Sequence, residues 1–146
     1  MEYHVSQVSG WKKVAEEIVS LCVKHTRHIV LLSGDLGAGK TTLAQEIARL
    51  FGVRETVNSP TFVIKKSYPV THDAWNTLVH ADLYRLTTPR ELDTTALRQD
   101  LENEKAFVLI EWPEQISHVL NNPHVKVSIV HEQLETRKVT LEISEK

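Results

Sequence analysis

The sequence has few of the residues on which several classes of protein depend. Its 146 residues include a single cysteine, Cys22, which excludes a disulfide within the chain and a zinc site built from cysteines. The eight histidines show no zinc-type spacing, so we expect no zinc. No apolar run approaches the roughly 20 residues that cross a bilayer, so we expect no association with membranes.

Neither sign of charge predominates. Lys and Arg total 17 against 19 Asp and Glu, which gives a formal net charge of −2. This balance excludes a generally basic surface for nonspecific binding of nucleic acid, although it leaves room for a local basic patch. The first ten residues are polar and lack the apolar core of a signal peptide, so we expect a cytoplasmic protein.

The remaining composition is that of one folded unit. Hydrophobic residues make up 41% of the chain and charged residues 25%, as in ordinary globular proteins. A chain of this length buries roughly 70% of its unfolded surface, which is enough for a self-sufficient core. The sequence has no internal repeat, low-complexity tract or linker, so we expect a single domain over residues 1–146.

Helical periodicity is present in three segments. Apolar residues at three- and four-residue steps from Trp11 to Cys22 predict an amphipathic helix of about three turns. A second helix is predicted around Leu43 to Leu50, with Gly52 placed to end it. The charged segment from residue 89 to residue 101 predicts a third helix.

Strands are predicted by two other patterns. Continuous apolar runs at 29–32 and 106–110 indicate strands buried on both faces, and shorter ones are expected at 62–64 and 77–79 around a polar connection. Alternating residues at 125–129 and 139–143 predict half-exposed, antiparallel strands. Together these patterns predict an α/β fold, with a mainly parallel central sheet flanked by helices and an antiparallel C-terminal hairpin.

A phosphate-binding loop lies between the first buried strand and the second helix. The pattern G-x-x-x-x-G-K-[ST] is matched in full, and the residues expected to hold a nucleotide are Gly34, Asp35, Leu36, Gly37, Ala38, Gly39, Lys40, Thr41 and Thr42. Glycines let the backbone wrap around an anion, and the N-terminus of the following helix adds unpaired N–H groups. A chance glycine turn is the alternative, but the flanking strand and helix favour a P-loop NTPase fold that binds a nucleoside triphosphate.

Three side chains of this loop have separate expected roles. Lys40 is a point charge suited to the β- and γ-phosphates, and Thr41 can place its hydroxyl on Mg²⁺. Thr42 could reach the α-phosphate. We therefore expect ATP and Mg²⁺ as cofactors.

Two strands end in carboxylates that could complete the Mg²⁺ site. Glu111 follows the more hydrophobic strand, so we expect it to be the metal-linked carboxylate. Asp82 then orients or deprotonates the attacking water, or binds the metal through water. The alternatives are a surface acid at Glu111 and, at Asp82, a helix cap or a partner of Arg85.

Three further residues have open interpretations. Thr61, in a Ser-Pro-Thr-Phe segment about twenty residues after Lys40, could sense the γ-phosphate, or the segment could be an ordinary turn that opens a strand. Trp11 could stack on a base, although a core position is favoured. Trp112 could report on the site or simply pack.

Four motifs, in this order and spacing, resemble one known family. They are GDLGAGKTT at 34–42, SPTF at 59–62, HADLYRL at 80–86 and LIEWP at 109–113. The family is the bacterial tRNA threonylcarbamoyladenosine biosynthesis ATPase, TsaE, also called YjeE. The phosphate loop is shared with many proteins, whereas its combination with the other motifs is specific, and the resemblance covers about residues 9 to 130.

The resemblance implies a small cytoplasmic ATPase required for threonylcarbamoylation of the adenosine beside the anticodon in tRNAs reading codons that begin with A. It implies that the protein does not transfer the group itself. Instead it binds a complex of the transferase subunit TsaD and its pseudo-homologue TsaB, whose repeated turnover depends on ATP hydrolysis; tRNA is served indirectly. Carried over to this chain, residues 36–41 hold the phosphates, Thr41 and Glu111 bind Mg²⁺, Asp82 and Thr61 serve hydrolysis and switching, and Trp112 lies beside the site.

Two other functions fit the phosphate loop. A small phosphotransferase would use the same loop, but it usually needs an arginine-bearing lid, and the sequence shows no obvious lid insertion. An ATP-dependent binding module would bind nucleotide with negligible hydrolysis. Hydrolysis measured with and without the transferase complex separates these possibilities.

Overall fold

A single mixed sheet runs through the protein. The computed structural model describes residues 1–35, 37–55, 57, 65–85, 96–115, 120–133 and 135–145. Within these ranges the sheet has seven strands: β1 (Glu2–Val5), β2 (Ile29–Gly34), β3 (Lys65–Pro69), β4 (Thr77–Asp82), β5 (Ala106–Glu111), β6 (His124–His131) and β7 (Arg137–Ser144). Their order across the sheet is β1-β7-β6-β2-β5-β4-β3.

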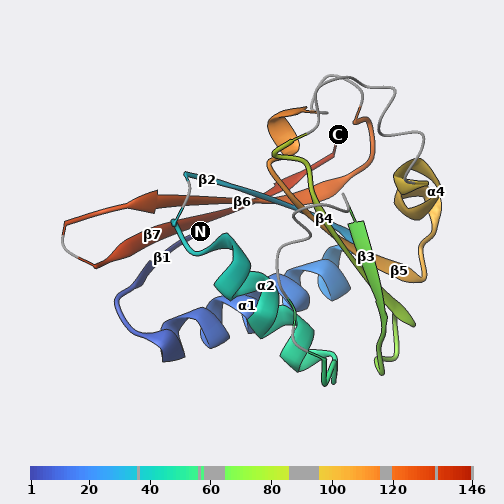
Figure 1. The fold of residues 1–146 in the computed structure, drawn as a ribbon, viewed down its shortest axis with the longest axis horizontal. Coiled ribbons are helices and arrows are strands. Elements are labelled where there is room, and N and C mark those ends of the chain that lie inside the picture. The colour runs from blue at the N-terminus through green and yellow to red at the C-terminus, as the bar shows by residue number, and fades with distance from the viewer. Residues whose placement is uncertain are drawn as a thin grey trace.

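The direction of the strands follows the predicted arrangement. The four central strands β6, β2, β5 and β4 are parallel, and the margins are antiparallel. Strands β6 and β7 form the predicted C-terminal hairpin, which extends well beyond the helices in Figure 1. Since β2 and β5 are buried along their first four residues, they form the centre of the sheet, as their continuous apolar sequences predict.

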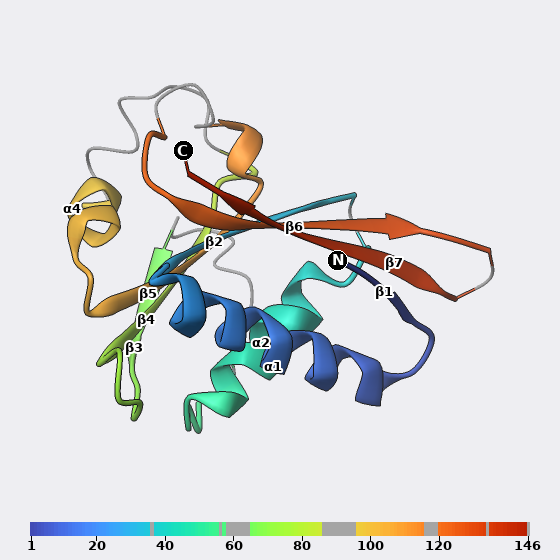
Figure 2. The same ribbon diagram turned by 180° about the vertical axis from the view of Figure 1, so that it is seen from behind.

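Helices cover the two faces of the sheet unequally. Helices α1 (Val8–His25) and α2 (Lys40–Leu50) lie side by side on one face, and α4 (Leu97–Glu102) packs on the other (Figures 1 and 2). A short 3₁₀ helix, η1 (Pro113–Gln115), follows β5. None of the helices among the described residues is long and apolar enough to cross a membrane.

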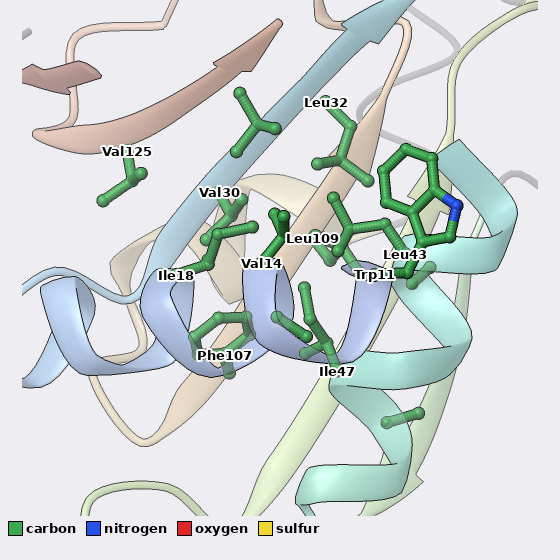
Figure 3. Close-up of a cluster of buried hydrophobic side chains, with 14 of the residues drawn as sticks. Trp11, Val14, Ile18, Val30, Leu32, Leu43, Ile47, Phe107, Leu109 and Val125 are labelled. Atoms are coloured by element: carbon green, nitrogen blue, oxygen red, sulfur yellow. The ribbon is translucent and has the colours of Figure 1, made fainter. Parts of the chain in front are cut away.

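The larger core lies between the sheet and the α1–α2 pair. Side chains that alternate along β2 and β5 meet apolar residues of both helices there, as Figure 3 shows for Leu32, Leu109 and Leu43. The other members of each strand face α4, where Leu97 and Leu101 cover them. This division fixes which strand residues share a face with α2, and therefore with the phosphate loop.

Several predicted elements differ in extent from those observed. Helix α1 has 18 residues rather than about three turns. Thr26 caps its C-terminus with a left-handed backbone (φ 56°), and the Thr26 N–H donates hydrogen bonds to the carbonyls of Cys22 and Val23. The buried Cys22 thiol has its pKa raised to about 12 by desolvation, which suits the predicted core position. The part of the predicted third helix that is described is α4; residues 86–95 lie outside the described residues.

Two edge strands were missed. The segment containing Pro69 was predicted to be a polar connection, but residues 65–69 form β3, which pairs with β4. Strand β1 lies in the polar N-terminal segment and pairs with β7. Both prediction errors have one cause: edge strands carry few apolar residues, and only Tyr68 of β3 and Val5 of β1 are buried. The strand predicted at 62–64 lies outside the described residues.

An aromatic cluster joins the C-terminal end of α2 to the β3–β4 turn. Phe51 contacts the rings of His72, Trp75 and Phe107 at centroid distances of 5.4, 5.7 and 4.9 Å. The Phe51 carbonyl also accepts a hydrogen bond from the Thr71 N–H (3.1 Å). The cluster therefore fixes the position of α2, and so of the loop at its other end, relative to the sheet.

Phe51→Ala should lower the free energy of unfolding by about 3–5 kcal/mol, because it leaves a cavity among three rings. The neighbouring Leu50→Ala is the control, since Leu50 is 37% exposed and its truncation should cost under about 1 kcal/mol. Urea unfolding followed by circular dichroism measures both. Equal losses in the two variants would show that the cluster does not anchor α2.

Candidate functional site: a phosphate loop with two carboxylates

The phosphate loop is held open by backbone conformations that favour glycine. Strand β2 ends at Gly34, and α2 begins at Lys40. Between them Gly37 and Gly39 have φ values of 78° and 119°, in the region that side chains with a Cβ rarely adopt. Backbone N–H groups at the start of α2 therefore lie at the loop, where they and the helix dipole favour an anion. Leu36 lies outside the described residues.

Gly39 has a second reason to be glycine. A Cβ at this position would lie 2.4 Å from the Trp11 ring atom Cζ2, much closer than a real contact. Trp11 is 8% exposed and belongs to the core between α1 and the sheet. This burial favours packing beneath the loop over stacking on a base, the two roles expected for Trp11.

Lys40 is a buried cation at the N-terminus of a helix. Its side chain lies over the Trp112 ring, with Nζ 4.1 Å from the ring centroid. The Nζ group donates hydrogen bonds to the carbonyls of Gly34 and Asp35, the second at 3.1 Å. Lys40 is only 5% exposed, so these contacts replace most of its hydration. These three partners, from the described part of the chain, are neutral, and an anion in the loop would be a stronger partner.

The charge balance around Lys40 comes from four acids. Desolvation lowers the pKa of Lys40, while Glu111, Asp82, Glu114 and Asp35, in decreasing order of influence, oppose that shift. The two largest opposing influences come from the two carboxylates predicted for the metal site. Lys40 thus interacts electrostatically with both Glu111 and Asp82.

Sheet register brings the two carboxylates together. Asp82 of β4 lies directly opposite Glu111 of β5, and Glu111 also pairs in register with Leu32 of β2. Since side chains alternate along strands, both carboxylates lie on the same face as Leu109 and Leu32, which is the face covered by α2. Asp82 is half-buried and Glu111 is 2% exposed. Two like charges this close favour a cation between them.

The ends of β4 and β5 carry two further aromatic residues. Trp112 has a left-handed backbone (φ 58°), and its N–H donates to the Leu32 carbonyl (3.3 Å). Its ring lies 4.8 Å from that of Tyr84, which is 48% exposed. The Tyr84 N–H donates to Asp82 Oδ1 (3.0 Å). The family resemblance implied that Trp112 lies beside the site, and no role was expected for Tyr84, because its contacts depend on turns that follow the strands.

The arrangement fits a phosphate chain with a divalent cation. Thr41 and Thr42 are half-buried in the first turn of α2, after the loop. The oxygen ligands that Mg²⁺ prefers are available from the Thr41 hydroxyl and the carboxylates of Glu111 and Asp82. Mg²⁺ in such sites is held by one or two protein groups plus phosphates and water, so no larger protein cage is needed. Thr61 lies outside the described residues.

The fold and the loop define the class of protein. The structure is similar to the crystal structure of YdiB from Bacillus subtilis, with a TM-score of 0.72 over 100% of this chain and 86% of that chain, at 23% sequence identity. With its parallel central strands and the phosphate loop between β2 and α2, the chain has the fold of a P-loop NTPase.

The family follows from sequence. Residues 5–139 match the family described as "Threonylcarbamoyl adenosine biosynthesis protein TsaE", and the chain belongs to this family. It is 41% identical over 103 residues to the tRNA threonylcarbamoyladenosine biosynthesis protein TsaE of Rickettsia bellii, covering 70% of this chain and 68% of that protein. Its identity to the Haemophilus influenzae protein of the same name is 38% over 120 residues, covering 81% and 72%. In the Rickettsia conorii and Rickettsia felis relatives the chain spans 55% and 57% of the length.

Gly39→Ala should destabilise the protein and abolish nucleotide binding, because the new methyl group meets both an unfavourable φ and the Trp11 ring. The control is Gly52→Ala, since Gly52 also has a positive φ (78°) but has open space around its Cβ position. Backbone strain alone costs about 1–3 kcal/mol. In urea unfolding, Gly39→Ala should therefore lower the free energy of unfolding clearly more than Gly52→Ala does. Equal losses would contradict the ring contact, and adding Trp11→Leu should restore part of the stability of Gly39→Ala.

Proposed function

We propose that this protein binds Mg²⁺ and ATP and hydrolyses the ATP in the service of tRNA threonylcarbamoyladenosine formation. The observation that carries the proposal is the buried Lys40 in a phosphate loop next to two carboxylates, in a chain of the TsaE family. The pathway comes from the family, and the chemistry comes from the site.

Phosphate binding is the role of the loop and of Lys40. Residues 34–42 wrap the phosphate chain with backbone N–H groups, and Lys40 neutralises the terminal phosphates. Lys40 gives up its carbonyl partners, Gly34 and Asp35, for phosphate oxygens, which are charged acceptors and bind an ammonium group more strongly.

Hydrolysis is the role of the two carboxylates. Thr41 and Glu111 would hold Mg²⁺, which when bound supplies positive charge to the phosphate oxygens. Asp82 orients the attacking water and accepts its proton. Its half-buried position, with Oδ1 already accepting the Tyr84 N–H, restricts the carboxylate to a few orientations. Thr61 senses the γ-phosphate in this proposal, which rests on its sequence position alone.

The partner in this proposal is the transferase complex of TsaD and TsaB. The chain does not transfer the threonylcarbamoyl group; its ATP hydrolysis resets the complex for another turnover in the cytoplasm. A net charge of −2 fits contact with tRNA through that complex rather than directly. Hydrolysis by the isolated protein should be slow, because in this proposal the partner supplies part of the charge that stabilises the transition state.

The test is ATP hydrolysis by the purified protein, alone and with the transferase complex, followed by nucleoside analysis of the tRNA. We expect stimulation by the complex and repeated formation of the modified adenosine. Asp82→Asn is the control, and it should bind ATP within about threefold of the wild type but hydrolyse it about 100-fold more slowly. Phosphoryl transfer to a small metabolite without stimulation would indicate a kinase, and binding without hydrolysis would indicate a binding module.

Lys40→Ala should weaken ATP binding about 10- to 100-fold and ADP binding much less, because a charged hydrogen bond to the terminal phosphate is lost. Isothermal titration calorimetry with ADP and a non-hydrolysable ATP analogue measures the difference. Lys24→Ala is the charge-matched control, since Lys24 is exposed in the last turn of α1. An equal loss for both nucleotides would contradict the assignment of Lys40 to the terminal phosphate.

A further inference from the structure

His80 is a fully buried polar residue to which the proposed mechanism gives no role. It lies in β4, in register with Leu109 of β5, and is 0% exposed. Strand alternation places it on the face covered by α2, two residues before Asp82. Its neighbours on that face include the core residues Leu78 and Leu109. Burying an imidazole there costs free energy unless its nitrogens are hydrogen-bonded.

The two ring nitrogens of His80 differ: one has a hydrogen-bond partner among the described residues and the other has none. Nε2 of His80 lies 2.5 Å from Oε2 of Glu111, and both side chains are at most 3% exposed. Because a carboxylate only accepts, the hydrogen of this bond lies on Nε2. Nδ1 is buried and has no hydrogen-bond partner among the residues that the structure describes. Within that part of the chain, the polar contact that positions this ring is the one to Glu111.

We propose that His80 is a positioning residue that sets the orientation of the Glu111 carboxylate toward Mg²⁺. This inference rests on the proposed function, in which Glu111 holds the metal. The terminal torsion of a glutamate is broad, so each hydrogen bond to its carboxylate narrows the orientations that it samples. The bond from Nε2 fixes Oε2 on the β4 side, and with it the plane in which Oε1 lies. Carboxylates that bind metals are commonly held in this way by a second hydrogen-bonding group.

The geometry distinguishes this role from simple filling of the core. An apolar side chain would fill the same space beside Leu78 without leaving Nδ1 unpaired, so packing alone does not explain a histidine here. Nor does burial of Glu111 require this particular partner, because Lys40 already lies within its electrostatic influence. What His80 adds is a directed donor from the strand that also carries Asp82. Strand β4 thus supplies the Asp82 carboxylate, strand β5 supplies the Glu111 carboxylate, and the bond from His80 to Glu111 connects the two strands.

The experiment compares three replacements by the reach of their donor. The amide nitrogen of His80→Gln can occupy the place of Nε2, whereas that of His80→Asn reaches only the place of Nδ1, and His80→Met has no donor. The readout is binding of a non-hydrolysable ATP analogue, measured by calorimetry over a range of Mg²⁺ concentrations and in EDTA. Leu78→Ala is the control for destabilisation of the same strand without loss of the bond.

We expect His80→Met and His80→Asn to raise the Mg²⁺ concentration for half-maximal enhancement of binding by about 10-fold or more. Affinity in EDTA should stay within about twofold, and His80→Gln should recover most of the Mg²⁺ response. The proposal would be overturned if His80→Asn left the Mg²⁺ concentration for half-maximal enhancement unchanged. It would also be overturned if His80→Gln needed as much Mg²⁺ as His80→Asn. An equal shift in Leu78→Ala would overturn it as well.

The same titration separates this inference from the proposed function. If the wild-type protein binds the analogue equally with and without Mg²⁺, the assignment of Glu111 to the metal fails, and the role of His80 fails with it. If the wild type responds to Mg²⁺ and all His80 variants respond in the same way, only the positioning role fails. The two amides differ by one methylene, so their comparison stands even where His80→Met does not fold.

Discussion

The structure depends on the placement of one buried cation at the positive end of a helix. Lys40 begins α2, is almost fully buried, and has two carbonyls and an aromatic ring as direct partners among the described residues. The helix N-terminus and the burial both disfavour an ammonium group, and neutral carbonyls and a ring compensate for them less well than negative charge does. The carboxylates at the ends of β4 and β5 supply part of that charge, and a phosphate chain would supply the rest. The site is therefore built around an anion.

The register of the sheet positions Glu111 and Asp82 relative to Lys40. Strand β5 lies between β2, which leads into the loop, and β4, which ends in Asp82. A shift of one residue in either pairing would turn Glu111 or Asp82 to the α4 face and remove one of the two largest opposing charges from Lys40. The continuous burial of β2 and β5 makes such a shift costly. Core packing thus determines the electrostatics of the site.

The central strands, α1, α2 and the loop could be predicted from sequence because each has a local signal: an apolar run, a helical period or a glycine pattern. Strands β1 and β3 could not, since their stability comes from pairing with a neighbour and they bury little of their own. The pairing of Asp82 with Glu111 was expected in outline from the ends of two strands. The bond between His80 and Glu111 was not, because it depends on the register of β4 against β5.

The contacts of Lys40 also affect how tightly the site can bind a triphosphate. The contribution of Lys40 to triphosphate affinity is its interaction with the phosphates less the loss of its contacts with Gly34, Asp35 and Trp112. Trp112 in turn packs against the exposed ring of Tyr84, whose N–H is bonded to Asp82. Lys40 is therefore connected to the exposed Tyr84 ring through one side chain, that of Trp112. The buried cation of the loop and the protein surface lie close enough for direct contacts to join them, without a long-range pathway.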